Sequence, residues 1–216
     1  MNLLPSSATQ STPNPDFADL ASDEQIATTL EALSANNIQT VVVESAEEAR
    51  QYVLGLLPEG AEVHTGASRT LDHIGLTAEI EESGRYQAIR PQLRQLDRRT
   101  QGREWRKLAS SPDFMLGSVH AVTAQGQALV AFGGGSQIGP YASGAGAVIW
   151  VVGAQKLVRT LEDGLRRVQE YAYPLEDERM REATGRSTHL NQILVINGSL
   201  QPNRLKMVIV KEHLGI

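Results

Sequence analysis

One imidazole and one amine are the side chains best suited to chemistry in this sequence. His120 is the only group that titrates near neutral pH within residues 114–155, a stretch without Asp, Glu, Lys or Arg, although roughly a quarter of residues in globular proteins carry a charge. Such an imidazole is a candidate general acid or base, and the alternative is a histidine whose hydrogen bonds serve only the fold. Lys156 directly follows the stretch and could neutralise an anionic ligand.

Short segments rich in glycine and hydroxyl residues follow several of the expected strands. Glycine lets the backbone approach a ligand closely, and free amides at a helix N-terminus attract anions. We therefore expect these segments to line a pocket for a small anion or nucleotide. The alternatives are a tight strand-to-helix turn capped by Ser68 and close packing of the glycine loops. The candidate ligand-binding residues are Thr65, Gly66, Ser68, Gly117, Ser118, Thr123, Gly133, Gly134, Gly135, Ser136, Gln137, Gly139, Gly153 and Lys156.

Several familiar motifs are missing from the sequence. No G-x-G-x-x-G follows an expected strand, residues 139–144 lack the Lys and Ser/Thr of a P-loop, and there is no G-x-S-x-G elbow. The five histidines show neither H-x-H nor H-E-x-x-H spacing, so we expect no metal site. The lack of cysteine excludes disulfides, thiolate catalysis and cysteine-bound iron–sulfur clusters within this chain, and it is compatible with a reducing cytoplasm.

The net charge and hydropathy of the chain argue against nucleic acid and membranes as partners. A net charge of −5 gives no overall attraction for nucleic acid or anionic membranes. No apolar run approaches the length of about 18 residues that a membrane span needs, and the N-terminus lacks the layout of a secretory signal, so we expect a cytoplasmic protein. Residues 85–107 are locally basic, but Leu93 and Leu96 favour a solvated amphipathic helix there, with an acidic protein or a phosphate as its partner rather than DNA.

The order of the expected elements predicts a layered α/β fold. Residues 1–16 are expected to form a flexible tail, and residues 17–216 a single domain. Capping boxes that begin at Ser22 and Ser45 predict helices on either side of a strand at residues 40–43.

The second half of the chain supplies the centre of the predicted sheet. The apolar run at residues 147–152 ends in a glycine, which predicts a strand buried on both faces, as in a parallel sheet. A helix over residues 154–174 follows, closed by a proline, and the last strands are predicted at residues 193–196 and 207–210. Because ligands of parallel sheets gather at the carboxyl ends of strands, Lys156 should lie at the binding edge.

Four segments of the sequence together resemble the LUD-domain family of lactate utilisation proteins, and the resemblance covers roughly residues 23–216. The most specific part is V-V-G-x-x-K-[LI]-V followed by L-[ED]-x-x-x-x-R. The resemblance implies a three-layer α/β/α, Rossmann-like fold of the NagB/RpiA/CoA-transferase-like group, with a mostly parallel central sheet. It also implies an accessory role in an L-lactate oxidation system, beside iron–sulfur and flavin-linked partner proteins. The segments that carry it are EVHTGASRTLDHIGL, GSVHAVTAQGQALVAF, GSQIGPYASGAGAVIWVVGAQKLVRTLEDGLRRVQEYAYPLEDER and MVIVKEHLG.

The chain departs from the commoner family pattern at two places. Ala124 stands where relatives often have an acidic residue, and Ser136 and Gln137 stand where others carry Asn-Arg. These departures favour a subgroup with a different ligand or none. Because the chain has no cysteine, iron–sulfur clusters and FAD are expected only in partner proteins.

The family supplies no catalytic set to carry over, so an enzymatic role stays open. Enzymes of this fold group that transfer CoA use a glutamate nucleophile, and the only acid between Glu104 and Glu162 is Asp113. Asp72, Asp113 and His120 are the side chains to propose for an isomerase. The alternatives to an accessory component are a stand-alone enzyme for a phosphorylated or CoA-linked metabolite and a ligand-binding regulator. The sequence leaves the oligomeric state open, including a homo-oligomer.

Overall fold

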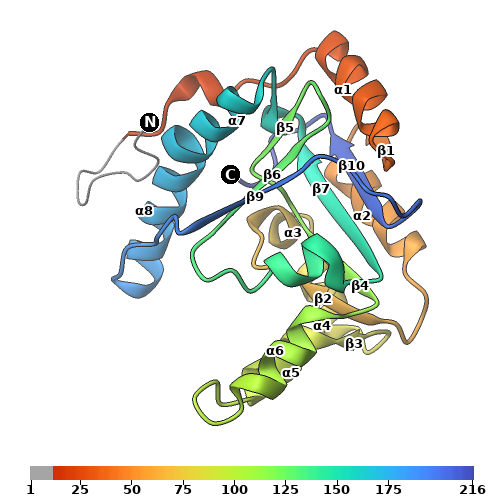
Figure 1. The fold of residues 1–216 in the computed structure, drawn as a ribbon, viewed down its shortest axis with the longest axis vertical. Coiled ribbons are helices and arrows are strands. Elements are labelled where there is room, and N and C mark those ends of the chain that lie inside the picture. Colours follow the sequence, from red (N-terminus) through yellow and green to blue (C-terminus); the bar gives the residue numbers. More distant parts are fainter. Residues whose placement is uncertain (1–11) are drawn as a thin grey trace.

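The computed structural model describes residues 12–216, and its centre is a six-stranded parallel sheet (Figure 1). The strand order is β1-β10-β7-β4-β2-β3, and every neighbouring pair in it is parallel. The predicted mostly parallel central sheet is therefore confirmed. The strands are β1 (Ile38–Val43), β2 (Glu62–Thr65), β3 (Gln87–Ala88), β4 (Phe114–Gly117), β7 (Ala147–Gly153) and β10 (Leu205–Val210).

Strand β7 lies inside the sheet, between β10 and β4, as its apolar sequence predicts. Its residues from Val148 to Gly153 are all buried, and they alternate between two separate cores. Val148, Trp150 and Val152 belong to one core, whereas Ile149 and Val151 belong to the other. A continuous apolar run without polar alternation is what a strand covered on both faces requires.

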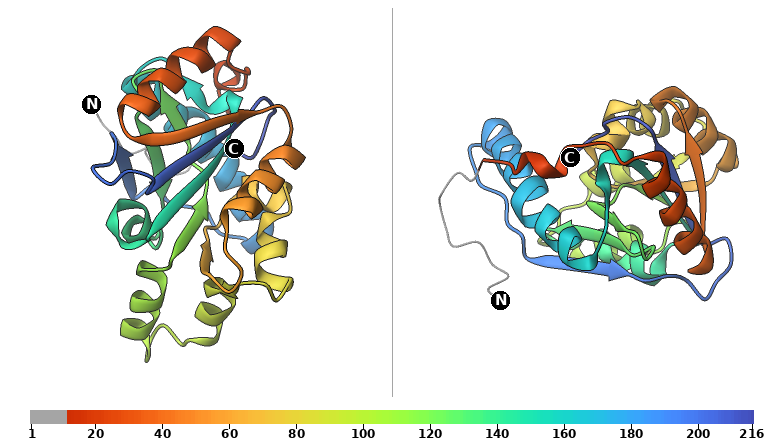
Figure 2. Two further views of the ribbon diagram at one scale, coloured as in Figure 1. Left: turned by 90° about the vertical axis from the view of Figure 1, so that its right-hand side faces the viewer. Right: turned by 90° about the horizontal axis from the view of Figure 1, so that it is seen from above.

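Helices cover one face of the central sheet. The core on this face contains Ala49 and Val53 of α2, Leu71 of α3, and Leu76 and Ile80 of α4. Figure 2 shows this helical layer and the sheet from two further directions. The helices are α1 (Asp23–Ala35), α2 (Ala46–Leu56), α3 (Arg69–His73), α4 (Leu76–Glu82), α5 (Ile89–Gln95), α6 (Gly102–Ser110), α7 (Leu161–Arg167) and α8 (Tyr173–Thr184). Two short 3-10 helices, η1 (Pro15–Phe17) and η3 (Ala154–Lys156), and two π-helical segments, η2 (Pro140–Gly144) and η4 (Val168–Ala172), accompany them.

A second, four-stranded sheet lies over the other face, which completes a three-layer α/β fold. Its order is β8-β5-β6-β9, with β5 and β9 both antiparallel to β6. The core between the two sheets also takes up Leu33 of α1 and Tyr141 of η2. No sequence pattern predicted this second sheet, although the strand predicted at residues 193–196 is present in it as β9. Its strands are β5 (Ala121–Thr123), β6 (Ala128–Phe132), β8 (Leu157–Val158) and β9 (Gln192–Ile196).

The predicted start of α1 is confirmed in detail. The hydroxyl of Ser22 accepts from the backbone N–H of Gln25, and the Gln25 side chain accepts from the backbone N–H of Ser22. At α2 only half of the predicted capping box forms. Ser45 caps the N–H of Glu48, but the Glu48 carboxylate accepts from the N–H of Glu44 instead. The single hydrogen bond from the Glu48 N–H to the Ser45 side chain is enough to cap the start of this helix.

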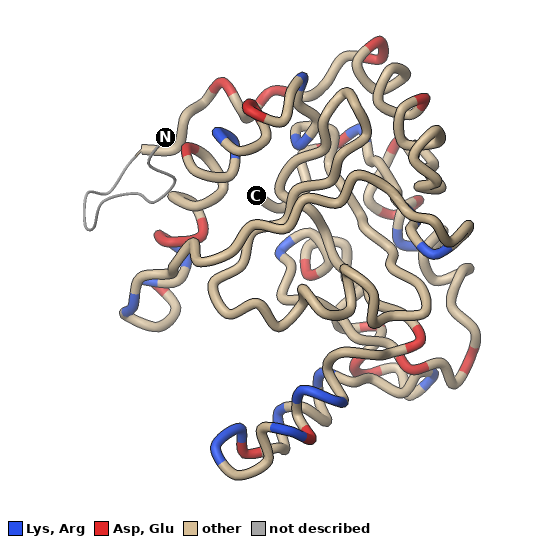
Figure 3. The backbone as a smooth tube through the Cα atoms, in the orientation of Figure 1, with Lys and Arg blue, Asp and Glu red and all other residues tan. Residues whose placement is uncertain are grey.

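The basic stretch forms two helices rather than the single predicted one. Helices α5 and α6 make a hairpin that projects from the body (Figure 1), and Figure 3 shows its concentration of Lys and Arg. Leu93 is buried in a small local core with Ile89 and Ala109, whereas Leu96 lies after the helix end and is only partly buried. The amphipathic interpretation was therefore right for the face but wrong for the length.

The prediction of one helix over residues 154–174 was wrong at both ends. Residues 154–158 form the η3 turn and the short strand β8, which pairs with β5, and α7 starts only after its cap at Thr160. Pro174 does not end the segment, because it occupies the first turn of α8, where a proline is tolerated. The i, i+4 spacing of Asp163 and Arg167 predicts an ion pair in this helix, but Asp163 instead closes the capping box at Thr160.

The N-terminal prediction concerns residues that are partly outside the described chain. Residues 1–11 are not among those described, but Asn14 of the expected tail packs on the body. Its side chain donates to the Glu170 carboxylate at 2.9 Å and its backbone N–H donates to the Glu170 carbonyl. Within residues 12–216, no helix is long and apolar enough to cross a membrane.

Candidate functional site

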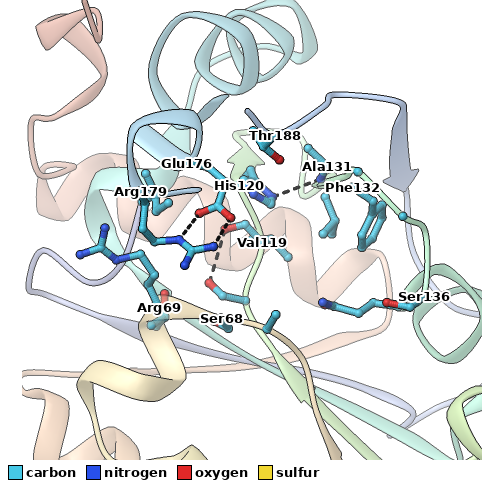
Figure 4. Close-up of a pocket in the computed structure, with 18 of the residues that line it drawn as sticks. Ser68, Arg69, Val119, His120, Ala131, Phe132, Ser136, Glu176, Arg179 and Thr188 are labelled. Carbon is cyan, nitrogen blue, oxygen red and sulfur yellow. Dashed lines mark hydrogen bonds and ion pairs between the residues drawn. The ribbon is translucent and has the colours of Figure 1, made fainter. Parts of the chain in front are cut away.

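A cavity of about 430 Å³ opens at the carboxyl ends of the central strands (Figure 4). The chain enters it just after β2, at residues 67–70, just after β4, at residues 118–120, and just after β7, at Lys156. The loop after β6, residues 133–137, closes another side. This edge of a parallel sheet is where ligands of α/β proteins bind, and the sheet therefore explains why distant segments meet here.

Lys156 is the most unusual side chain in the cavity wall. Only 2% of its surface is exposed, and its Nζ lies 3.1 Å from both Thr70 Oγ1 and Ser118 Oγ. Burial, and secondarily the charge of Arg167, lower the pKa of Lys156 well below its usual value. Burial removes water from the charged ammonium, so the protonation equilibrium shifts toward the neutral amine.

Arg167 is fully buried behind the cavity, and its positive charge contributes to the lowered pKa of Lys156. Its guanidinium donates to the carbonyl oxygens of Gln155 and His120, and it lies 4.9 Å from the ring of Tyr171. It therefore ties the segment that carries Lys156 to the segment that carries His120. Burial lowers the pKa of Arg167 to about 10.

The histidine in the cavity is held as a neutral ring. The backbone N–H of Ala131 donates to His120 Nδ1 at 3.1 Å, so the proton of the neutral ring is on Nε2. Burial, together with the charges of Lys156 and Arg167, lowers the pKa of His120 to about 3. Near pH 7 this side chain is a hydrogen-bond donor from Nε2, and its low pKa argues against a role as a general base.

Charged side chains form the outer wall of the cavity. Arg69 of α3 and Arg179 of α8 lie next to each other in Figure 4, and the Arg179 guanidinium binds Glu176 through two hydrogen bonds. The hydrogen bond to Glu176 raises the pKa of Arg179, and the charge of Asp72 adds to the effect. Arg90 also reaches the cavity, so arginine and lysine outnumber Asp and Glu in the lining.

The cavity gathers nine of the predicted site residues. It brings together residues that the chain separates by almost ninety positions, from the β2 loop to Lys156. Two of the positions that depart from the family pattern, Ser136 and Gln137, are among them, whereas Ala124 lies in the β5–β6 turn. The predicted residues in the lining are Ser68, Ser118, His120, Gly133, Gly134, Gly135, Ser136, Gln137 and Lys156.

Six predicted residues lie outside the lining, and close packing or structural hydrogen bonds account for four of them. A Cβ at Gly117 would lie 1.7 Å from the Tyr141 hydroxyl, and one at Gly153 would lie 2.7 Å from backbone atoms of residues 212 and 214. A Cβ at Gly139 would only make ordinary contact with Ser110, 3.4 Å from its Oγ. Gly117 and Gly153 are therefore needed for close packing, which was the alternative interpretation. The six are Thr65, Gly66, Gly117, Thr123, Gly139 and Gly153.

The two threonines among them have structural hydrogen bonds. Thr123 is fully buried, and its hydroxyl accepts from the backbone N–H groups of Gln125 and Gln127 in the turn after β5. The Thr65 hydroxyl donates to the Glu81 carboxylate at 3.5 Å. Of the carboxylates considered for an isomerase, Asp72 lines the cavity, whereas Asp113 lies before β4, at the opposite end of that strand.

Several residues of the site were missed by the sequence analysis. Arg69 and Thr70 lie directly after Ser68, so their position beside a predicted anion loop was a usable signal. Glu176 and Arg179 gave no local signal, because the preceding helix was predicted to end at Pro174. The described residues include no group of three or more His, Asp or Glu side chains arranged to hold a metal ion.

The fold and the cavity define a three-layer α/β protein with a ligand-sized site at the carboxyl edge of a parallel sheet. A family model described as the LUD domain matches residues 26–210, and the chain belongs to this family. It is similar to the crystal structure of a DUF162-family protein from Deinococcus radiodurans, with a TM-score of 0.54 and 15% sequence identity over 89% of this chain and 99% of that one. At this identity the likeness shows the fold alone. Among curated proteins no match was found.

Proposed function

We propose that this LUD-domain protein is an accessory component of an iron–sulfur- and flavin-linked L-lactate oxidation system, and that its cavity binds a small anion. The observation that supports anion binding is the cluster of cationic side chains on the cavity wall, with Arg69 and Arg179 next to each other. Guanidinium groups bind carboxylate and phosphate through two parallel hydrogen bonds. Lactate, pyruvate and phosphorylated metabolites all present such groups.

The ligand's charge is assigned to the two arginines rather than to Lys156. The Lys156 amine is buried and already bonded to two hydroxyls, and its lowered pKa means that it holds its charge weakly. Arg69 is exposed and can reach an incoming anion. Arg179 is only partly buried, and its Nη1 lies outside the two hydrogen bonds to Glu176. The exposed glycines at 133 and 134 offer backbone N–H groups on the facing side.

A thermal-shift titration tests the anion site. We expect lactate, pyruvate or inorganic phosphate to raise the melting temperature by about 5–10 °C at a hundredfold excess over the dissociation constant, from a stabilisation of about 2.7 kcal/mol. Arg69→Gln and Arg179→Gln should each reduce the shift. The matched control is Arg103→Gln, which removes an exposed charge on the α5–α6 hairpin. Equal shifts in all variants would reject the assigned arginines.

The pathway role needs a separate test in the host cell. We expect deletion of the gene to impair growth on L-lactate as sole carbon source. An affinity-tagged copy should restore growth and purify together with iron–sulfur and flavin proteins. Normal growth of the deletion strain, with no such partners, would refute the pathway role and leave the anion site untouched.

A further inference from the structure

Two hydroxyls share the buried amine of Lys156, and their other contacts make them unequal. Thr70 is 1% exposed, and its hydroxyl donates to the Leu214 carbonyl at 3.3 Å. The Thr70 oxygen therefore accepts one N–H from Lys156, which fixes the direction of the amine. Ser118 is only partly buried and lines the cavity. Its remaining contact, to the Val119 carbonyl, is long, at 3.4 Å.

A neutral amine in this position has a lone pair for a second hydroxyl. One of its N–H bonds points at Thr70, and Ser118 Oγ lies 3.1 Å away on the cavity side. A hydroxyl next to a base within hydrogen-bond reach, with the base oriented by a third group, is the arrangement of an activated nucleophile. Serine–lysine pairs are a known variant of the serine–histidine–aspartate triad.

We propose that Ser118 is a nucleophile for acyl esters or thioesters, with Lys156 as its general base and Thr70 as the residue that positions Lys156. In this reaction Ser118 Oγ bonds to the acyl carbon while its proton passes to Lys156 Nζ. The bond from the acyl carbon to the leaving oxygen or sulfur then breaks, and Lys156 returns the proton to that atom. Attack by water, deprotonated by the same amine, releases the acid and restores Ser118.

His120 is suited to the charge that develops during this step. The tetrahedral intermediate of acyl transfer carries a negative oxygen, which neutral hydrogen-bond donors stabilise. The His120 ring lines the same cavity, two residues after Ser118, with its proton on Nε2. Arg69 and Arg179 on the outer wall favour an acyl group or a leaving group that carries a negative charge.

The depressed pKa of Lys156 supports the assignment without being needed for the geometry. A lysine is a useful base near neutral pH only if burial makes its free amine accessible there. Because burial is the main cause of the lowered pKa, the same feature that hides the amine from solvent also prepares it to accept the Ser118 proton.

A phosphorofluoridate such as diisopropyl fluorophosphate tests the nucleophile directly on the full-length protein. Attack by Ser118 forms an Oγ–P bond, expels fluoride and leaves the proton on Lys156. We expect one adduct per chain in the intact mass, mapped to the peptide that contains Ser118. Ser118→Ala and Lys156→Met should abolish labelling, and Thr70→Val should slow it at least tenfold. The matched control is Ser34→Ala, an exposed serine on α1 that should leave the rate unchanged.

The wild-type protein keeps the proposal falsifiable even if a variant fails to fold. Its labelling rate should rise with pH through one ionisation, that of Lys156. The pH midpoint of this rise should be the same in His120→Gln. No adduct on the folded wild type, an adduct elsewhere than Ser118, or equal labelling in folded Lys156→Met would each overturn the proposal. The proposed anion site does not depend on this result, because its arginines are tested by a binding shift.

Discussion

Substitution of the glycine before Ser118 should be strongly destabilising for a reason visible only in the fold. A Cβ at Gly117 would lie 1.7 Å from the Tyr141 hydroxyl oxygen and 2.9 Å from its Cζ. Tyr141 is fully buried and packs edge-on against Trp150, with ring centroids 5.7 Å apart. Because non-bonded heavy atoms need about 3.5 Å, Gly117→Ala must displace this ring by roughly 1.5–2 Å. We expect a loss of about 3 kcal/mol in the free energy of unfolding.

A double-mutant cycle in urea isolates the contact. Among the described residues, the buried Tyr141 hydroxyl has no partner at hydrogen-bonding geometry, so Tyr141→Phe alone should change stability by less than about 1 kcal/mol. In the Tyr141→Phe background, the Gly117→Ala penalty should fall to about 1 kcal/mol, because only the ring contacts at 2.9 Å (Cζ) and 3.4 Å (Cε1) are left. Gly55→Ala is the control: it meets no atom within 4 Å in α2 and should stabilise the protein by about 0.5–1 kcal/mol. An unchanged midpoint for Gly117→Ala, or the same penalty with and without the hydroxyl, would refute this reasoning.

Two further predictions concern pH and a buried arginine. The pKa of His120 is lowered from 6.5 to about 3. The imidazole of the unfolded chain is therefore protonated below pH 6.5, whereas that of the folded protein is protonated only below about pH 3. The free energy of unfolding should therefore decrease as the pH falls from 6.5 to 3. Urea titrations at several pH values should show a shallower decrease in His120→Gln. Arg204 is buried and donates to three backbone carbonyls of the η2 segment and the residue after it. Arg204→Met should lower the free energy of unfolding by about 2–4 kcal/mol, because those carbonyls lose their partner; calorimetry showing an unchanged melting temperature would contradict this.

The central sheet was largely predictable because its signals are local. Strand β7 is recognisable from an apolar run that a doubly covered strand requires, and α1 from a capping box whose two hydrogen bonds form within four residues. The expectation that Lys156 lies at the carboxyl edge followed from the rule that ligands gather there. These features depend on residues close together in the chain, where sequence patterns are informative.

The helix after β7 was mispredicted because tertiary contacts override its periodicity. Leu157 fits a helical stripe with Leu161 and Leu165. In the structure, however, residues 157 and 158 pair with β5 and extend the second sheet. Arg167, whose i, i+4 spacing from Asp163 suggests an ion pair, is instead fully buried, and its guanidinium donates to carbonyl oxygens. Such a choice depends on partners elsewhere in the chain, which no local pattern reports.

The sequence by itself determined the layered α/β class, the central strand, the first helix cap and the segments from which a site would be built. Only the tertiary structure decided which hydroxyls meet the lysine: Thr70 lies 86 positions from Lys156 and Ser118 lies 38 positions from it, yet both are 3.1 Å from its amine. Only the fold separated glycines that face the cavity from Gly117 and Gly153, which face neighbouring atoms. The physical reason is that strand order and packing, rather than local propensity, bring the carboxyl ends of β2, β4 and β7 to one edge.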